Sequence, residues 1–532
     1  MRKGLFFGCC FLLICLIIGE SMIRKTPEPG FVYVKHNGLQ CNGESFFPLM
    51  LNYIVDCQED EDGNFILAPY AEYDSAQYVE AVGKEAVAQQ LAGHFQLVKE
   101  LGFNTLRVCF DRVLFDDSNH PYYPTDGRHF YLNQRSDRNA IFKGVESFLR
   151  LAEERHLRVM LLIKPPIEND DLEVFTVELL KYFSKDTTLF AYDFMNEPLY
   201  FDTEENRLKT DAQNIVEHWR KLVRKNAPNQ LFTIGFSEPI EVLEWDAAML
   251  PVDFVEIHTY HPLRIPNEIY WYAKYVGKPW MVGETGLPAD GDSISYDSQQ
   301  ALFEAAYTLT RDAGGCGFGW WEFQELSVSH FEARYTGLLN HQGITQTADG
   351  KHVVKGTLKI TPEQISEIIN HYVPNEVKRP VNYYNMMGYQ NIVITGEILD
   401  STTTTPVEGA VIRGWNEDWS VGMNTFSDEN GHFTLYCNAP CTHFEISAPQ
   451  MTKVKFNRHL SYLNHQGEES NVNNLKDNKL EYTVEVKQIS LLASSILSAL
   501  TNHSYQLVFL CMLEFFMLFF SFLKIVISKY RS

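Results

Sequence analysis

The stretch LFAYDFMNEP, residues 189–198, begins as an apolar strand and ends on an amide, a carboxylate and a proline. Its bulky side chains Phe190, Tyr192 and Phe194 alternate along the chain, which is typical of a β-strand. A strand with so much apolar surface is expected to be buried, so a carboxylate at its end, that of Glu197, has to be explained. Seven other stretches of the chain have the same pattern, and together they explain its position.

Short β-rich runs recur eight times between residues 46 and 325, and longer stretches with helical spacing separate them. The clearest helical stretches are 140–156, 203–226 and 295–313. This alternation is typical of a parallel α/β fold, and about 280 residues suit a (β/α)8 TIM barrel, which takes about 250. The connection after the fifth run is short, so its helix is expected to be reduced. The eight runs are 46–53, 103–110, 157–166, 189–198, 231–239, 252–262, 278–288 and 315–325.

Every run starts apolar and ends polar, and in such barrels the carboxyl ends of the strands form the face that carries chemistry. Glu197 and Glu284 end the fourth and seventh runs, so barrel closure is expected to place both acids across one pocket. Cleavage of a glycosidic bond needs two such carboxylates, one protonated and one ionised. The polar ends of the eight runs are Asn52, Arg107, Lys164, Glu197, Glu238, His258 with Tyr260, Glu284 and Glu322.

Four motifs in this arrangement resemble those of the clan A retaining glycoside hydrolases. They are NEP after a buried strand, HTYHP two strands later, GETG on the next strand and GWWEF on the last. The set is most similar to glycoside hydrolase family 5, the cellulase and mannanase family, and the resemblance covers residues 30–372. GFNTLRV at 102–108 resembles that family's second strand, and YTGLLNHQG at 335–343 is similar to its stretch after the eighth strand.

The resemblance implies a role for each matching residue. Glu197 would be the acid/base and Glu284 the nucleophile, with no metal or organic cofactor. Arg107 would keep Glu284 ionised by its charge, although an arginine there could instead only pair with a barrel carboxylate for stability. Asn196 would hydrogen-bond the 2-hydroxyl of the bound sugar.

The remaining expected contacts come from the last three strands. His258 and Tyr260 would line the pocket, with Tyr260 touching the nucleophile, although a hydrogen-bonded core histidine is the alternative for His258. Trp321 would be the floor on which a sugar ring stacks. Trp320 competes for that position, because only one of two neighbouring strand residues faces inward.

A long aromatic and polar loop, residues 115–139, follows the second run. Loops on this face of a barrel often shape the substrate cleft. Tyr122 or Tyr123 is therefore expected to contact the sugar, unless the loop packs only on itself.

The chain beyond the barrel predicts a second, smaller unit. Residues 360–372 read as a closing helix, 373–390 as a linker and 391–488 as a small all-β sandwich. GAVIRG and TFSDENGHFTL resemble carboxypeptidase regulatory-like domains, and the second predicts a hairpin with an Asn-Gly turn. Cys437 and Cys441 would form a disulfide in an oxidising compartment or be two small buried residues.

The two ends of the chain suggest export. Arg2 and Lys3 precede an apolar run, so residues 1–25 read as a signal peptide or membrane anchor. Residues 505–528 are long enough to span a bilayer, with Glu514 counting against this and a buried helix as the alternative. Either end could therefore attach the protein to a membrane, in a periplasmic, cell-surface or extracellular location. The net charge of −23 argues against a nucleic-acid partner.

These features predict a retaining glycoside hydrolase that cuts a β-linked glucan or mannan, as a polysaccharide or oligosaccharide. One alternative is a carbohydrate-binding surface protein whose barrel no longer turns over substrate. Another is an unrelated barrel enzyme, such as an aldolase or isomerase. That class would need a Schiff-base lysine or metal ligands at strand ends, and Lys164 is the candidate lysine.

Overall fold

The computed structural model describes residues 28–70, 83–110, 130–326, 334–457, 461–463, 469–471 and 479–486. The predicted N-terminal segment 1–25 and the predicted membrane span 505–528 lie outside these residues. Within them, every helix is too short or too polar to cross a bilayer.

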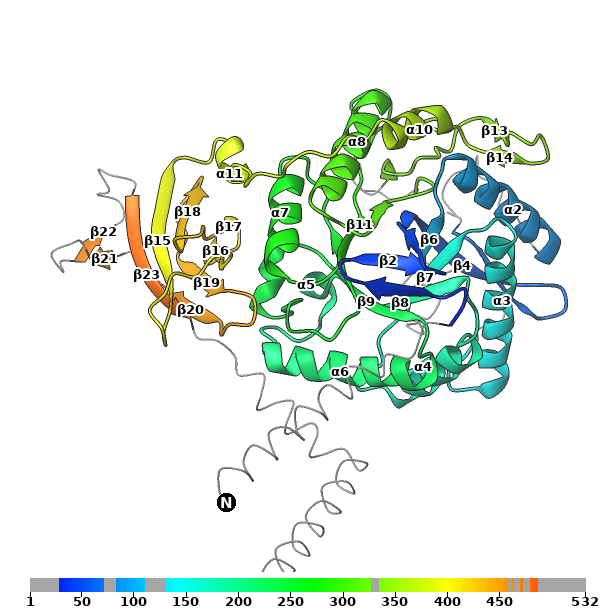
Figure 1. The fold of residues 1–532 in the computed structure, drawn as a ribbon, viewed down its shortest axis with the longest axis horizontal. Coiled ribbons are helices and arrows are strands. Elements are labelled where there is room, and N and C mark those ends of the chain that lie inside the picture. Colours follow the sequence, from blue (N-terminus) through cyan, green and yellow to red (C-terminus); the bar gives the residue numbers. More distant parts are fainter. Residues whose placement is uncertain are drawn as a thin grey trace, which may run out of the picture.

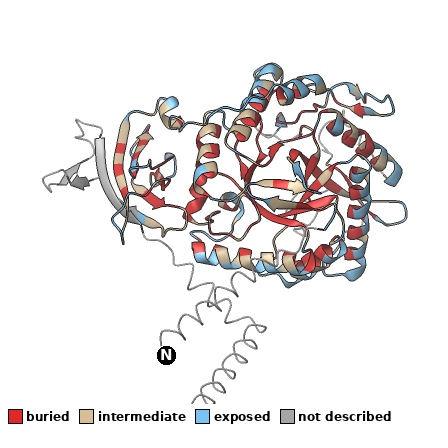
Figure 2. Ribbon diagram, viewed as in Figure 1, coloured by how far each residue is buried: buried red, intermediate tan, exposed pale blue. Residues whose placement is uncertain are grey.

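Eight parallel strands form a closed barrel, which confirms the predicted fold class. Each strand pairs with the next in chain order, and the last closes the barrel through the pairing of Gly319 with Met50. Every predicted run overlaps one of these eight barrel strands, and the strands form the buried centre of the molecule in Figure 2. They are β4 (Leu49–Glu59), β6 (Thr105–Cys109), β7 (Arg158–Leu162), β8 (Leu189–Asn196), β9 (Leu231–Phe236), β10 (Val255–His258), β11 (Trp280–Glu284) and β12 (Phe318–Trp320).

Amphipathic helices surround the barrel (Figure 1). The predicted helices correspond to α3, α6 and α8, and α3 buries the residues whose spacing predicted it, among them Ile141, Val145 and Phe148. The prediction for α6 began too early, because an ion pair between Arg207 and Asp202 holds the preceding segment as a loop. The helices are α2 (Lys84–Glu100), α3 (Arg135–Glu153), α4 (Asp170–Tyr182), α6 (Lys209–Asn226), α7 (Ile265–Tyr275), α8 (Tyr296–Asp312) and α10 (Pro362–Asn370).

Two connections depart from a full helix, and both lie beside the candidate site. The reduced helix expected after the fifth strand is the 3-10 helix η2 (Pro239–Leu243). After the fourth strand comes a single turn, α5 (Pro198–Phe201), and its first position is the proline that follows Glu197. Proline is favoured at a first helical position, because that position needs no N–H donor.

A small antiparallel sheet that the sequence did not predict covers the amino ends of the barrel strands. It consists of β1 (Val32–Lys35), β2 (Gly38–Cys41) and β3 (Glu44–Phe46) and crosses the barrel in Figure 1. Its apolar side chains Val32 and Leu39 belong to one buried cluster with residues near the starts of the barrel strands. These barrel residues include Met50, Met160, Phe190 and Met281. The polar residues predicted to do chemistry are therefore at the opposite, carboxyl end.

Two further strand pairs flank the barrel. The long first strand continues past the barrel and pairs antiparallel with β5 (Phe65–Pro69). After the eighth strand, β13 (Ile344–Gln346) and β14 (Val353–Lys355) form a hairpin.

The C-terminal unit is the expected small β-sandwich. Ile394 and Leu435 of one sheet pack against Ile412 and Phe444 of the other in a shared core. The predicted hairpin is wrong, because the Asp428–His432 turn connects strands of different sheets. One sheet contains β15 (Ile392–Asp400), β18 (His432–Cys437) and β23 (Lys479–Val486), and the other β16 (Val411–Trp415), β17 (Gly422–Phe426), β19 (His443–Ser447) and β20 (Val454–Asn457), with β21 (Ser461–Leu463) and β22 (Glu469–Asn471) as a separate pair.

Cys437 and Cys441, the candidate disulfide, are both buried as free thiols in this unit. Their sulfur atoms lie 3.8 Å apart, which is hydrogen-bonding distance for thiols and longer than a disulfide bond. The structure therefore agrees with the reading of two small buried residues.

The sandwich packs directly on the barrel. Lys209 Nζ lies 2.8 Å from Asp246 Oδ2 and donates to the Ala448 carbonyl at 3.0 Å, while the Gln450 amide donates to the same Asp246 oxygen at 2.6 Å. Tyr270 of α7 also stacks on Phe426 of the sandwich. Because these contacts are buried, the two units form one continuous body.

The predicted linker, 373–390, is part of this interface. It contains the short helix α11 (Tyr383–Met386), and Arg379 donates to the carbonyls of Phe426 and Ser427 at 2.7 and 3.0 Å.

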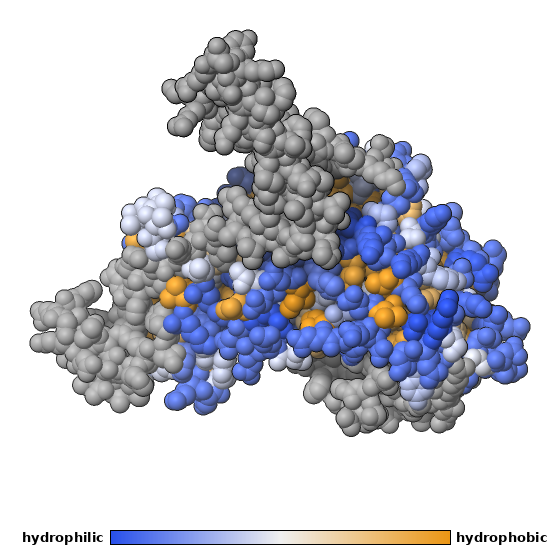
Figure 3. Space-filling view, turned by 90° about the horizontal axis from the view of Figure 1, so that it is seen from below, coloured by the Kyte–Doolittle hydropathy of each residue, from blue (hydrophilic) through white to orange (hydrophobic). Residues whose placement is uncertain are grey.

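The surface of the molecule that Figure 3 shows is mainly hydrophilic where its residues are described. The hydrophobic residues on this surface lie in small separate spots.

Candidate active site

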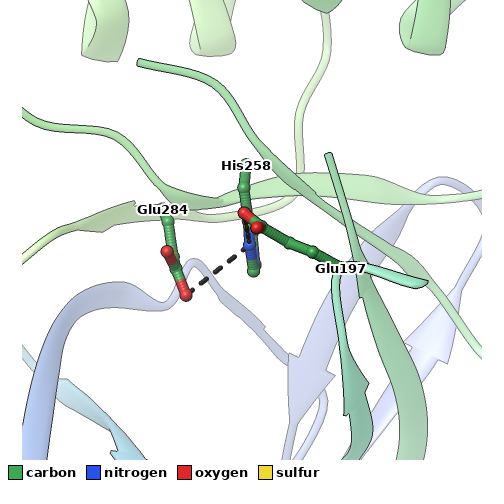
Figure 4. A group of neighbouring side chains, drawn as sticks. All are labelled: Glu197, His258 and Glu284. Atoms are coloured by element: carbon green, nitrogen blue, oxygen red, sulfur yellow. Dashed lines mark hydrogen bonds and ion pairs between the residues drawn. The ribbon is translucent and has the colours of Figure 1, made fainter. Parts of the chain in front are cut away.

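Glu197, His258 and Glu284 meet at the carboxyl end of the barrel. One carboxylate oxygen from each acid and one ring nitrogen of His258 lie within 4.8 Å of one another. Both carboxylates turn toward the imidazole in Figure 4. Closure of the barrel thus brings together two acids that are three βα units apart in the sequence, as the alternation of runs predicts.

Glu284 ends β11 and is 4% exposed. Its Oε1 accepts from Arg107 Nη1 at 2.5 Å, and its Oε2 accepts from the Tyr260 hydroxyl. Burial and the neighbouring Glu284 charge raise the pKa of Tyr260 well above its usual value, so the phenol keeps the proton that it donates. Both oxygens of Glu284 are therefore held by donors that fix their direction.

Arg107, on β6, also binds two buried acids that the sequence analysis did not single out. Its guanidinium lies 2.6 Å from Asp193 and 2.7 Å from Glu256. Burial opposes the positive charge, but Glu256, Asp193 and Glu284 outweigh it and raise the pKa of Arg107 well above its usual value. Burial raises the pKa of Asp193 to about 7, despite the opposing charge of Arg107.

Two asparagines complete the contacts of the guanidinium. Asn196 accepts from Arg107 Nη2 at 3.0 Å, and Asn52 accepts from Nη1 at 3.0 Å. Asn52 in turn donates to the carbonyls of Gly283 and Trp320 at 2.9 and 3.0 Å, which ties three strand ends together. Asn196 keeps its position beside the acids, while its expected contact with a sugar stays a prediction.

Glu197 adopts a backbone conformation that is rare for a side chain other than glycine, asparagine or aspartate. Its φ is 40° and its ψ 74°, in the left-handed region, and its amide donates to the Gly235 carbonyl at 2.8 Å. The strand register shifts between Asp193 and Asn196, just before this residue. Strained residues of this kind cluster at functional sites, because only a supporting structure can hold them.

His258 lies between the acids and is buried. Its Nδ1 is 2.8 Å from Glu197 and 3.5 Å from Glu284, and its Nε2 is 3.5 Å from Glu256. Burial disfavours the charged ring, but Glu284, Glu197 and Glu256 outweigh this and raise the pKa of His258 from 6.5 to about 10. The imidazolium and Arg107 thus supply two positive charges among four acids.

We expect stability to depend on the charge of His258. Because its folded pKa is raised, its contribution is complete below about pH 6.5 and is lost as pH rises toward 10. The free energy of unfolding of the wild type should therefore fall by about 3–5 kcal/mol more than that of His258→Asn between pH 7 and pH 10. Urea denaturation of both proteins at each pH measures this, and equal decreases would contradict it.

Two glycines make room for the site. A Cβ on Gly235 would lie 2.7 Å from His258 Nε2, and one on Gly283 would lie 1.9 Å from Glu256 Oε1. This requirement for glycine could not be read from the sequence, because it depends on side chains from neighbouring strands. Asp193 and Glu256, by contrast, could have been singled out from the sequence, since each is an acid inside an otherwise apolar strand.

Gly235→Ala tests this close packing. The added methyl group would displace the His258 ring, so we expect the free energy of unfolding to fall by about 1–3 kcal/mol, as for other overpacked cores. Gly422→Ala is the matched control, because a Cβ there meets no atom within 4 Å. Similar losses in both variants, measured by urea denaturation, would contradict the expectation.

Of the two tryptophans that compete for the floor of the site, Trp321 has the suitable exposure. Trp320 is fully buried, packs on Phe303 at a ring separation of 5.4 Å and donates from Nε1 to the Thr336 carbonyl. Trp321 is partly exposed beside a small apolar cluster at the carboxyl end, which includes Ile54. Stacking of a sugar on Trp321 remains a prediction.

Other residues singled out in the sequence lie elsewhere or outside the described ranges. Tyr122 and Tyr123 belong to residues 111–129, which the structure does not describe. Glu238 is engaged by Arg264, Asn424 and Tyr200 at the edge of the barrel. Lys164, the lysine considered for a Schiff base, lies two residues after the end of β7 and is partly exposed.

Glu197, His258 and Glu284 have the spacing of a three-residue metal site. Their surroundings oppose one: Arg107 already binds Glu284, and the raised pKa of His258 favours its protonated form, which has no free nitrogen for a metal. The arrangement is better suited to holding and moving protons.

No protein-family model matches the sequence, and no curated protein does either. Among solved structures, the chain is similar to a β-D-glucuronidase of Dictyoglomus thermophilum, with 13% identity and a TM-score of 0.40 over 65% of this chain and 55% of that one. It is also similar to an exo-β-1,4-mannosidase of an Opitutaceae bacterium, with 15% identity and a TM-score of 0.43 over 64% of this chain and 63% of that one. An endo-1,4-β-mannanase of Rhizomucor miehei matches with 13% identity and a TM-score of 0.40 over 57% of this chain and 93% of that one.

The chain thus spans less than two thirds of the glucuronidase and of the mannosidase. At such low identities and TM-scores, these likenesses carry no argument about activity. What this protein does has to be inferred from its own side chains.

Proposed function

We propose that this protein is a retaining glycoside hydrolase that cleaves a β-linked glucan or mannan. The observation that carries the proposal is the approach of Glu197 and Glu284, whose facing oxygens lie within 4.8 Å of each other. Retaining enzymes hold their carboxyl groups about 5–5.5 Å apart, whereas inverting enzymes need about 6.5–9.5 Å to admit a water molecule. The short separation therefore supports attack by a carboxylate.

In the first step, Glu284 attacks the anomeric carbon and the bond to the leaving oxygen breaks. Arg107 and Tyr260 hold the two oxygens of Glu284, so the attacking lone pair has a fixed direction. Glu197 gives its proton to the leaving oxygen, and an ester links the sugar to Glu284. His258, in contact with both acids, stabilises the carboxylate that Glu197 becomes.

In the second step, water replaces the first product. Glu197 takes a proton from this water as its oxygen attacks the anomeric carbon, and the ester bond to Glu284 breaks. Two inversions at one carbon restore the original configuration, and both acids return to their starting protonation states.

The substrate class and the location are parts of the same proposal. The NEP, HTYHP, GETG and GWWEF motifs support a β-glucan or β-mannan, and the sugar-facing roles of Asn196 and Trp321 follow from the same motifs. Export is supported by the charged and apolar start of the chain, and membrane attachment by the apolar segments near either end.

Product stereochemistry tests the mechanism. The full chain is screened on cellulose, mannan and aryl β-glycosides, and the first product is followed by proton NMR. Retention of the β configuration is expected, and an α product would overturn the double displacement. Binding of oligosaccharide without any product would favour the alternative, a carbohydrate-binding protein on the same barrel.

A further inference from the structure

One sheet of the sandwich turns a polar and aromatic face toward the barrel. Arg413 of β16 lies opposite Asn424 of β17 and Glu445 of β19, and Trp415 lies opposite His443. Residues directly opposite each other in a sheet share a face. The intervening residues form the core of the sandwich instead: Ile412, Met423, Phe444 and Ile446.

This face ends in a stack of three rings. Trp415 is stacked on His443 at a centroid distance of 5.5 Å and on Trp419 at 4.8 Å, and the Arg413 guanidinium lies 4.7 Å from the Trp419 ring. Trp415 is buried, but Trp419 is 56% exposed. Trp415 covers one face of the Trp419 ring, and more than half of the surface of Trp419 stays exposed to solvent.

The turn that carries Trp419 holds it in a costly conformation. Its φ is 59°, in the left-handed region that glycine and asparagine usually occupy. The side chain of Asn416 accepts from the Val421 amide at 3.0 Å and donates to Ser420 at 2.8 Å, so the turn is braced. A large apolar ring in a strained and exposed position suggests a function, because neither packing nor turn chemistry favours tryptophan there.

The ring stack is connected to the candidate active site through α5. Tyr200 and Phe201 of α5 are 59% and 61% exposed and lie three and four residues after Glu197 in the chain. The Tyr200 hydroxyl approaches Glu238 at 3.5 Å, and Asn424 donates to the other oxygen of Glu238 at 3.2 Å. In Figure 1, α5 lies on the side of the barrel that faces β16 and β17.

Electrostatics indicates the same neighbourhood. Burial lowers the pKa of Arg413, while the nearby charges of Glu445 and Glu244 act in the opposite direction. Arg413 lies opposite Asn424, which donates to Glu238, and Arg413 also contacts the Trp419 ring. One surface therefore leads from Glu197 over α5 to the sandwich.

We propose that this surface is a sugar-binding platform on which the sandwich holds the distal pyranose rings of a β-linked oligosaccharide whose scissile bond lies between Glu197 and Glu284. The proposal rests on the proposed hydrolase function for the position of the reacting bond. The axial C–H groups of a pyranose form a flat, weakly positive face that matches the negative face of an indole ring. Arg413 and Asn424 add donors for hydroxyl groups beside the rings.

The test compares a long and a short substrate on the full chain. For Trp419→Ala, we expect kcat/KM on cellohexaose or β-1,4-mannohexaose to fall about two- to twelvefold relative to kcat/KM on the matching aryl β-glycoside, since one aromatic contact is worth about 0.5–1.5 kcal/mol. Trp419→Phe should recover most of this ratio, because it restores an aromatic face. Tyr182→Ala is the matched control, since Tyr182 is an exposed aromatic residue of α4.

Each outcome of this comparison either supports or overturns the sugar-binding platform. An unchanged ratio, or the same change in Tyr182→Ala, would overturn the platform. An equal loss on both substrates would also overturn it, because it would indicate general damage to the fold. If the wild type hydrolyses neither substrate, the hydrolase proposal fails by itself. Calorimetric titration with the hexasaccharides then decides the platform, which requires binding by the wild type and weaker binding by Trp419→Ala.

Discussion

Glu284→Ala is expected to lower kcat on an aryl β-glycoside by at least about 10⁴-fold, because it removes the carboxylate that is placed to form the covalent intermediate. Arg107 and Tyr260 both donate to this carboxylate, so the fixed geometry of attack disappears with it. Steady-state release of the aryl group measures the effect. The wild-type rate in this variant would refute the proposed mechanism.

Two controls separate lost chemistry from lost structure. Glu284→Gln keeps the size of the side chain but not its charge, so it should be equally inactive while staying folded. Azide fits the space opened in Glu284→Ala and can attack the anomeric carbon from the same side. Added azide should therefore restore turnover to Glu284→Ala and not to Glu284→Gln, and no restoration in either would argue against the role of nucleophile.

Arg107→Met is expected to lower the free energy of unfolding by about 3–5 kcal/mol at pH 7, since it leaves buried carboxylates without their cation. Asp193, Glu256 and Glu284 all lie within 2.7 Å of the guanidinium, and Arg107 has no exposed surface. Lower pH should reduce the loss, because protonated carboxyl groups need no counter-charge. Urea denaturation at pH 5 and pH 7 measures both effects.

Arg138→Met is the control for Arg107→Met. Arg138 also pairs with an acid, Glu178, at 2.7 Å, but Glu178 is 37% exposed. Such a pair contributes about 1 kcal/mol or less. Similar losses in the two variants would mean that the buried group around Arg107 has no special importance for stability.

The sequence predicted the barrel well because its signals are local. Each strand carries its own alternation and its own polar end, and closure of the barrel follows from eight such units. The approach of Glu197 to Glu284 could be predicted for the same reason, since the carboxyl ends of all strands in a closed barrel surround one central region. Parts that depend on contacts between distant residues could not be predicted in this way.

The sheet β1–β3 is the first example of a part that could not be predicted from the sequence. Its strands are three or four residues long, and what fixes them is burial of Val32 and Leu39 against the ends of the barrel strands. Gly235 is the second, because its lack of a side chain matters only where His258 arrives from the next strand. The turn after β17 is the third: Asn430 and Gly431 predict a turn, but not which sheet the next strand joins.

The contact of Lys209 with Asp246 and the Ala448 carbonyl has a consequence for how a polymer is captured. A module on a loose tether searches a large volume, so a chain bound there reaches the reaction centre at a low effective concentration. A docked module holds the sandwich platform and the candidate active site at one fixed spacing. The entropy cost of bringing these two sites together is therefore part of the folding of the protein and not of polymer binding. A polymer that fits this spacing would dissociate slowly and be cut near the same distance from its held end, which predicts products of a narrow size range.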